Sequence, residues 1–496
     1  MRRATLLLGP AVLAMAVVAA PPDRSVDASI RHLRSAVLPS ADGGTPVLLS
    51  SLRQLRDPRM RSFLLQLAQH GELSAQVHAI LGLAEIDPAG HVDPWLISQL
   101  EEANARYVTI EAAIGLDLID TPQMKELLGW DNLDPRSRGL LLAELLSKDE
   151  PVDREALTAL AAHSDLDISG LAACLLAQLG DGLALDAYRV RVDAEPDHVR
   201  NLLLRAMWAA VRVYKLTAAT DWVAETVVGD RLAQEIIAEG VSTVLVLDPE
   251  RGVELWNRML GADPSYSRMV RYAFLLLAAG PTIPASAYDR LPSDDTLLAS
   301  MAHAGRALSD ESDIASSLIE LVDLGHRGTM SWVMQVATDL DDAQATRLFT
   351  HVIDTMESGD PRSAQARTEV AFVAASRLFD LDADAIIERL NRAPDNSLLQ
   401  EAILLGLLDA RSPAAGAAAG NVDHTGFSRA DSLAMILIAK HAQQLTPAEL
   451  RQLGSIAAGG GQVSEMVRAQ AAWLYLRHAD RIEQAMVEVF APTDSP

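Results

Sequence analysis

Three aspartates at alternate positions come nearest to a metal site in this sequence. Asp380, Asp382 and Asp384 have the spacing with which a calcium-binding loop begins, where carboxylate oxygens bind a hard cation. Ala385 stands where such a loop needs glycine for its sharp turn, and Asn391 stands where a bidentate glutamate completes the oxygen shell. We therefore predict no metal here, and expect Asp382 or Asp384 to cap the helix that follows.

The signatures of common hydrolases and nucleotide-binding enzymes are absent from the chain. No His-Glu-x-x-His or Gly-x-Ser-x-Gly sequence occurs, no lysine has a serine three residues before it, and Gly459–Gly461 lacks a following Lys-Ser/Thr pair. Cys174 is the only cysteine, so no intramolecular disulfide can form, and its neighbours favour a buried position. His78 and His351 lie in helical stretches without metal-ligand spacing. The sequence thus assigns no catalytic, cofactor-binding or metal-ligating residue.

The tryptophans fall within apolar runs. Trp95, Trp208, Trp256 and Trp473 are examples. Aromatic side chains of this size either anchor a ligand or fill space between helices. Their apolar context favours packing.

The elements that position these residues are expected to be helices. Apolar residues make up 49% of the chain and aromatic residues only 4%, while alanine and leucine recur throughout. This bias is typical of closely packed helices, since strands prefer β-branched and aromatic residues. With 496 residues the chain is longer than a single compact core can accommodate, so we expect several domains or an extended repeat array.

The charge balance restricts the partners. The formal net charge is −25, and the chain has four lysines, Lys125, Lys148, Lys215 and Lys440. Nucleic acids and anionic membrane surfaces bind clustered cations, so both are poor partners for this protein. The balance predicts a neutral or cationic protein or extended peptide as the partner.

The first twenty residues have the layout of a secretory signal peptide. Arg2-Arg3 precede an apolar run from Ala4 to Val18, and small residues follow at Ala19-Ala20. We therefore expect a secreted or periplasmic protein, with an uncleaved membrane anchor as the alternative. No later segment is apolar enough to cross a bilayer.

A helical pattern repeats along the N-terminal half. Residues 79–87 and 112–120 match in apolar pattern, in their glycine and in their final aspartate, 33 residues apart. Residues 140–149 and 175–181 continue the series, with final aspartates stepping by 33, 29 and 32 residues. A period of about 30–34 residues indicates a two-helix unit that buries its apolar stripe against its neighbours.

A second pattern occurs in the middle of the chain. Residues 184–196 and 252–264 each begin with a small residue, have an aromatic residue four positions later and end in proline, and residues 382–394 keep the spacing. These units resemble degenerate tetratricopeptide repeats. Residues 166–181 and 467–474 are similar to the inner helix of a HEAT repeat. The resemblance implies an all-α fold, an α-α superhelix or solenoid over residues 46–490, with a binding role for its concave face.

Breaks in composition suggest the domain organisation. We expect a signal peptide at 1–20, a linker with an N-terminal helix at 21–45, and a helical-repeat array at 46–280. A possible hinge at 281–296 precedes a second array at 297–490 and a disordered tail at 491–496. Residues 410–428, rich in alanine and glycine, read as a long surface loop.

One enzyme family has a partial counterpart here. Soluble lytic transglycosylases are exported helical superhelices that cut peptidoglycan with the glutamate of a Glu-Ser motif. Glu311-Ser312 is similar to that motif, and Met334-Gln335 is similar to part of the family's Gly-Leu-Met-Gln segment. Trp332-Val333 replace the first two residues of that segment, and the aromatic residue expected after Ser312 is missing.

The sequence therefore favours an exported, non-catalytic binding or scaffolding protein that presents a helical-repeat surface to a protein or peptide. A lytic transglycosylase-like enzyme using Glu311 and a purely structural helical envelope protein are the alternatives.

Overall fold

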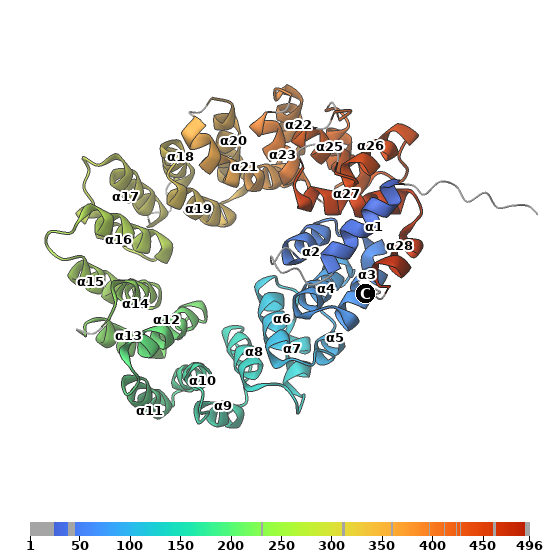
Figure 1. The fold of residues 1–496 in the computed structure, drawn as a ribbon. Helices are drawn as coiled ribbons and strands as arrows, with labels where there is room; N and C mark the ends of the chain where they lie inside the picture. The colour runs from blue at the N-terminus through green and yellow to red at the C-terminus, as the bar shows by residue number, and fades with distance from the viewer. Residues whose placement is uncertain are drawn as a thin grey trace, which may run out of the picture.

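The computed structural model describes residues 24–37, 45–229, 232–309, 313–358, 361–395, 397–410, 412–422, 424–426, 428–459 and 463–491. Within these ranges every regular element is a helix, and no strand occurs. The helices stack side by side in two layers, and the stack turns through a full circle to form a ring (Figure 1). The all-α repeat prediction is confirmed, and the array is closed rather than open.

The even-numbered helices form the inner layer of the first half of the ring, each packed against the next (Figure 1). They are α2 (Thr45–Gln54), α4 (Leu73–Ile86), α6 (Ala103–Gly115), α8 (Pro135–Ser147), α10 (Leu166–Gln178), α12 (Asp197–Val213), α14 (Gln234–Leu247) and α16 (Tyr266–Ala279). The helices between them are η1 (Pro58–Met60), α3 (Arg61–His70), α5 (Pro94–Ser98), α7 (Thr121–Leu128), α9 (Arg154–Ala161), α11 (Gly182–Asp193), η2 (Thr217–Ala219), α13 (Thr220–Val227) and α15 (Pro249–Leu260).

In the second half the inner layer consists of odd-numbered helices. They are α19 (Arg327–Val336), α21 (Pro361–Leu381), α23 (Leu398–Leu407), α25 (Arg429–His441) and α27 (Glu465–His478). Their companions are α18 (Ile314–Leu324), η4 (Ala337–Asp339), α20 (Asp342–Ser358), α22 (Ala383–Arg392), α24 (Ala414–Ala419), α26 (Pro447–Ala457) and α28 (Ile482–Val489). The numbering shifts because η3 (Ala285–Arg290) and the extra helix α17 (Thr296–Ser309) intervene. Residues 281–296, the proposed hinge, thus contain η3, where Tyr288 is fully buried.

The first sequence repeat corresponds to successive inner helices. Residues 79–87, 112–120, 140–149 and 175–181 lie at the C-terminal ends of α4, α6, α8 and α10. Their final aspartates occupy the joints: Asp120 caps α7, and Asp149 has a left-handed φ of 58° after α8. Aspartate tolerates both roles because its short side chain bonds to nearby backbone amides. The period therefore records where each inner helix stops.

The second sequence pattern corresponds to helices of the outer layer. Tyr188 on α11, Trp256 on α15 and Ile386 on α22 are all buried. The small residue before the aromatic lets two helices approach closely, since a Cβ at Gly252 would lie 2.5 Å from the Cα of Leu245 on α14. The pattern thus marks where an outer helix packs on the inner layer.

Ion pairs join helices one repeat apart. Arg53 on α2 pairs with Glu85 on α4 at 2.6 Å. In the same way Arg212 on α12 pairs with Glu239 on α14, also at 2.6 Å. The partners are 32 and 27 residues apart in the sequence, which is about one repeat. These two arginines therefore stabilise the stacking of successive repeats.

One sequence expectation is wrong. Residues 410–428 are not a long surface loop, because α24 lies within them and packs on α25. Ala415, Ala418 and Ala419 are buried, and a Cβ at Gly416 would lie 2.7 Å from His441. The small residues that suggested a loop instead allow a close helix contact.

Candidate functional site: the seam of the ring

The ring is closed by a contact between the two ends of the chain, which we call the seam. On one side lie α1 (Arg24–Val37), α2, η1 and α3, and on the other lie α25 to α28 (Figure 1). Phe63 on α3 packs against Trp473 on α27 and Phe490 after α28, with ring centroids 5.6 and 5.8 Å apart. A Cβ at Gly454 would lie 2.9 Å from Ser25, so glycine lets α26 approach α1.

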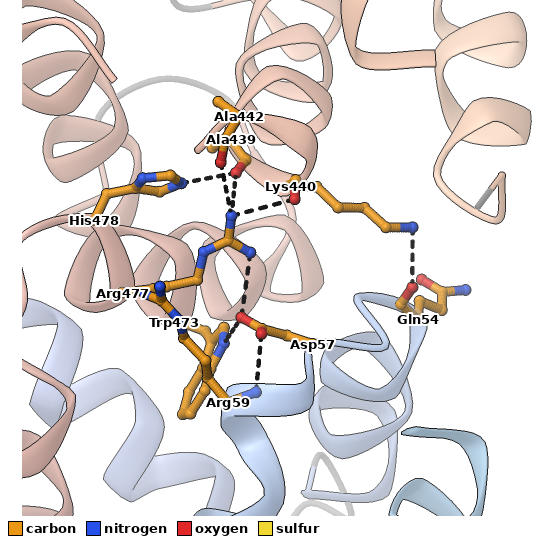
Figure 2. Close-up of polar contacts among 9 residues, drawn as sticks. All are labelled: Gln54, Asp57, Arg59, Ala439, Lys440, Ala442, Trp473, Arg477 and His478. Atoms are coloured by element: carbon orange, nitrogen blue, oxygen red, sulfur yellow. Dashed lines mark hydrogen bonds and ion pairs between the residues drawn. The ribbon is translucent and has the colours of Figure 1, made fainter. Parts of the chain in front are cut away.

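A buried carboxylate lies at the centre of the seam. Asp57 is 5% exposed, and its side chain accepts hydrogen bonds from Trp473 Nε1 at 2.9 Å and from Arg477 Nη1 at 3.2 Å (Figure 2). It also accepts from the backbone N–H of Arg59 at 3.0 Å and so caps η1. A buried charge is tolerated only when it is paired and hydrogen-bonded, and Asp57 satisfies both conditions across the seam.

Arg477 links this carboxylate to the end of α25. Its other guanidinium nitrogen donates to the carbonyls of Ala439, Lys440 and Ala442, at distances of 3.0 to 3.2 Å (Figure 2). The last carbonyls of a helix lack partners within the helix, so a cation there supplies both hydrogen bonds and favourable charge. Arg477, which lies on α27, therefore joins the residues between α2 and η1 to the end of α25.

Lys440 repeats this arrangement one helix earlier. Its ammonium donates to the carbonyls of Leu408 and Ala410 after α23, and across the seam to the carbonyl of Gln54 at 3.3 Å. Burial lowers the pKa of Lys440 to about 8, and Arg56 adds to this effect while Asp409 opposes it. Lys440, at the end of α25, therefore connects the C-terminal ends of α23 and α2.

Amide and hydroxyl groups complete the polar contacts. Gln470 is 2% exposed and donates to the carbonyl of Ser51 at 2.9 Å. The hydroxyl of Ser51 donates to Leu48 at 2.7 Å and contacts the carbonyl of Met466 at 3.4 Å. Since buried polar groups need partners, these contacts fix how α27 lies on α2.

Two histidines lie beside these cations. Burial, together with the charges of Lys440 and Arg477, lowers the pKa of His441 to about 4. Burial also lowers the pKa of His478, whose Nε2 contacts the carbonyl of Ala439 at 2.8 Å. Both imidazoles are therefore neutral at neutral pH.

A cavity of about 580 Å³ lies between α16 and α19, where the inner layer changes from even-numbered to odd-numbered helices. Trp332 forms part of its wall and donates from Nε1 to the carbonyl of Leu277 at 3.1 Å. The polar lining comes from Gln335, Asp339, Asp341 and Gln344. A smaller cavity of about 240 Å³ lies at the seam, between α1, α26 and α27.

Several residues that the sequence singled out have structural roles. Asp382 caps α22 by accepting from the N–H of Ala385 at 3.0 Å, as predicted. Cys174 is fully buried, and burial raises the pKa of its thiol to about 12. His351 contacts Asp323 at 2.8 Å. No group of three acidic, histidine or cysteine side chains in the described ranges lies close enough to hold a metal ion.

His78 and the tryptophans also contact protein groups. Nδ1 of His78 lies 3.2 Å from a guanidinium nitrogen of Arg53, and burial and that arginine lower the pKa of His78 to about 4. Trp208, Trp256 and Trp473 are fully buried, which confirms the packing interpretation, whereas Trp95 is 53% exposed.

Two predicted features lie outside the described residues, namely Glu311-Ser312 and the apolar N-terminal segment at residues 1–20. In the described part of the chain, no helix has both the length and the hydrophobicity needed to cross a bilayer.

Sequence reasoning missed Asp57, Arg477 and the closure itself. These two residues are 420 positions apart, so no local pattern connects them. An available signal was the Asp-Pro pair at 57–58, which is typical of a capped helix start.

Comparisons with known proteins provide little further information. No protein-family model matches the chain, and no curated protein matches it. Among solved structures, a chain in "Homology model of the full-length AP-3 complex in an intermediate open conformation" is 11% identical. The match covers 91% of this chain and 97% of that chain, with a TM-score of 0.40. No functional statement about this chain follows from so loose a similarity.

Proposed function

We propose that this protein is an exported, non-catalytic scaffold that binds a protein or extended peptide on its helical-repeat surface. The observation that supports the proposal is the closed ring. Because the seam fixes both ends, the inner helices have set positions, and a preformed surface binds without the cost of ordering it. In this proposal the units are HEAT-like and tetratricopeptide-like, and residues 1–20 direct the chain to the periplasm or the exterior.

The proposed partner is neutral or cationic. A net charge of −25 attracts a cationic partner and repels nucleic acid, and it does not repel a neutral partner. Association steered in this way weakens as salt screens the charges, with a Debye length of about 8 Å at physiological ionic strength.

Affinity capture tests the proposal. Tagged residues 21–496 are incubated with envelope extract at low and moderate salt, and each captured protein is purified and its binding measured separately. A purified partner that binds with a 1:1 or other fixed stoichiometry, and more weakly at moderate salt, supports the proposal.

Two results would contradict it. The first is the absence of any saturable partner at either salt concentration. The second is muropeptide release by the wild-type protein that is lost in Glu311→Gln, which would replace the scaffold with the transglycosylase-like enzyme. Export is tested separately by cell fractionation of the full chain and of a chain lacking residues 1–20.

A further inference from the structure

The inner helix α12 has a second apolar stripe that its own packing does not use. Leu202, Ala206, Ala209 and Val213 follow one another at i, i+4, i+7 and i+11, which places them on one helix face. Leu202 is 67% exposed and Val213 is 70% exposed, and the two alanines between them are exposed or half-buried. The stripe is about 17 Å long at 1.5 Å per residue.

The opposite face of α12 already holds the helix in the ring. Trp208 is fully buried and contacts Trp222 on α13 edge to face, with centroids 6.4 Å apart. Leu204 and Val211 are buried on the same side. A helix in an outer or inner layer needs one apolar stripe to pack, so the exposed stripe is not required by the fold. α12 lies in the inner layer (Figure 1), and its buried face packs on α13 of the outer layer, so the stripe opposite that face points toward the inside of the ring.

One border of the stripe carries two arginines in an otherwise acidic protein. Arg205 and Arg212 lie seven residues apart along the edge that faces α14. Arg212 is paired with Glu239 on α14 at 2.6 Å, whereas exposed Arg205 has no ion pair within the described part of the chain. An unpaired cation beside an apolar stripe is complementary to a carboxylate on a partner.

The spacing of the stripe favours a helical occupant. Rows of side chains at i±4 on one helix fit the grooves between rows on another, whereas an extended strand repeats every two residues. We propose that the inner face of α12 binds an amphipathic helix of the partner, with apolar residues at the same spacing and one carboxylate against Arg205. This inference rests on the proposed scaffold function and names the contact segment of its partner. A single carboxylate is compatible with a partner that is neutral overall.

A pair of synthetic amphipathic peptides tests the inference. Both have four leucines at i, i+4, i+7 and i+11, and the residue that flanks the stripe is glutamate in one and lysine in the other. Binding of the labelled peptides to the full chain is measured by fluorescence anisotropy. We expect the glutamate peptide to bind about tenfold more tightly than the lysine peptide.

Three variants locate the binding. Arg205→Glu should reverse the preference between the peptides, and Leu202→Asp should weaken binding of both about tenfold or more, because it places a charge in the apolar contact. Val190→Asp is the matched control, since Val190 is a valine on the outer helix α11 with 72% exposure. It should leave both affinities unchanged.

Each contrary outcome is distinct. If neither peptide binds, or if Leu202→Asp and Val190→Asp have the same effect, the inference is wrong. If a purified partner from affinity capture binds Leu202→Asp as tightly as wild type, the scaffold function holds and the contact lies elsewhere. If the protein has no partner at all and no peptide preference, both proposals fail.

Discussion

The seam and the α16–α19 junction are the two places where the regular order of the stack changes, and they are packed differently. At the seam no covalent link joins α2 to α27, and the contact is made by buried aromatic rings and by Asp57, Arg477 and Lys440. At the junction the chain runs continuously through η3, α17 and α18, and a cavity of about 580 Å³ remains. At the seam a smaller cavity of about 240 Å³ lies between α1, α26 and α27, so the two contacts differ in the size of the gap and in the buried ion pair that crosses the seam.

The largest expected effect comes from removing the buried carboxylate. Asp57→Ala removes the acceptor of Arg477 Nη1 and of the indole N–H of Trp473, and leaves the charge of Arg477 buried without its carboxylate partner. Breaking a buried ion pair in this way costs about 3–5 kcal/mol. We therefore expect a lower urea midpoint and an increased distance between fluorophores placed on α1 and α26.

Asp313→Ala is the matched control for this change. Asp313 also caps a helix, α18, and pairs with an arginine, Arg347, at 2.6 Å, but it is exposed. Its loss should lower the urea midpoint much less and leave the fluorophore distance unchanged. Equal effects of the two variants would show that the seam is not what holds the ring closed.

The same substitution in both regions sharpens the comparison. Trp473→Phe removes a donor to a buried carboxylate, which should cost about 1.5–3 kcal/mol, because hydrogen bonds to charged groups are the stronger ones. Trp332→Phe removes a donor to the carbonyl of Leu277, and should cost about 0.5–1.5 kcal/mol. Chemical denaturation of both variants measures the difference. A larger loss for Trp332→Phe would contradict the view that the junction is the more tolerant contact.

A further prediction concerns the pH dependence of stability. The pKa of His441 is about 4 in the folded protein, below its usual value of 6.5. Its contribution to stability is therefore complete above pH 6.5 and is lost as the pH falls through about 4, because the unfolded chain then binds the proton more readily. His478, with its lowered pKa, acts in the same direction.

His441→Gln tests this assignment. Between pH 7 and pH 4.5 the melting temperature of the variant should fall less than that of the wild-type protein. His351→Gln, at an exposed contact with Asp323, is the control for removing a histidine side chain away from the seam. An unchanged pH profile in His441→Gln would assign the acid sensitivity to other groups, of which His78 is the first to test, since its pKa is also about 4.

Repetition made the fold predictable from the sequence. The matching segments at 79–87 and 112–120 lie in equivalent helices, because each unit solves the same packing problem with the same residue types. Asp382 was predictable as a cap for a similar reason, since capping depends on a few neighbouring residues. The sequence misled at residues 410–428, where small residues suit either a loop or a tightly packed helix and only the surroundings of α24 decide between them.

The proposed binding face of α12 was not predictable in the same way. The exposed stripe on α12 has the apolar spacing of any amphipathic helix, so residue types alone do not separate Leu202 from buried Leu204. Only the position of α12 among α10, α11, α13 and α14 leaves one face uncovered.

By itself the sequence determined the helical units, their period and their caps, because these depend on residues within about one repeat of each other. The tertiary structure decided that the units form a ring. Each inter-repeat step adds a small rotation, and whether the sum brings α27 against α2 depends on every step together, which no segment encodes. The structure likewise gave Asp57 and Arg477 their shared role, since their distance in space is set by that sum and not by their distance in the chain.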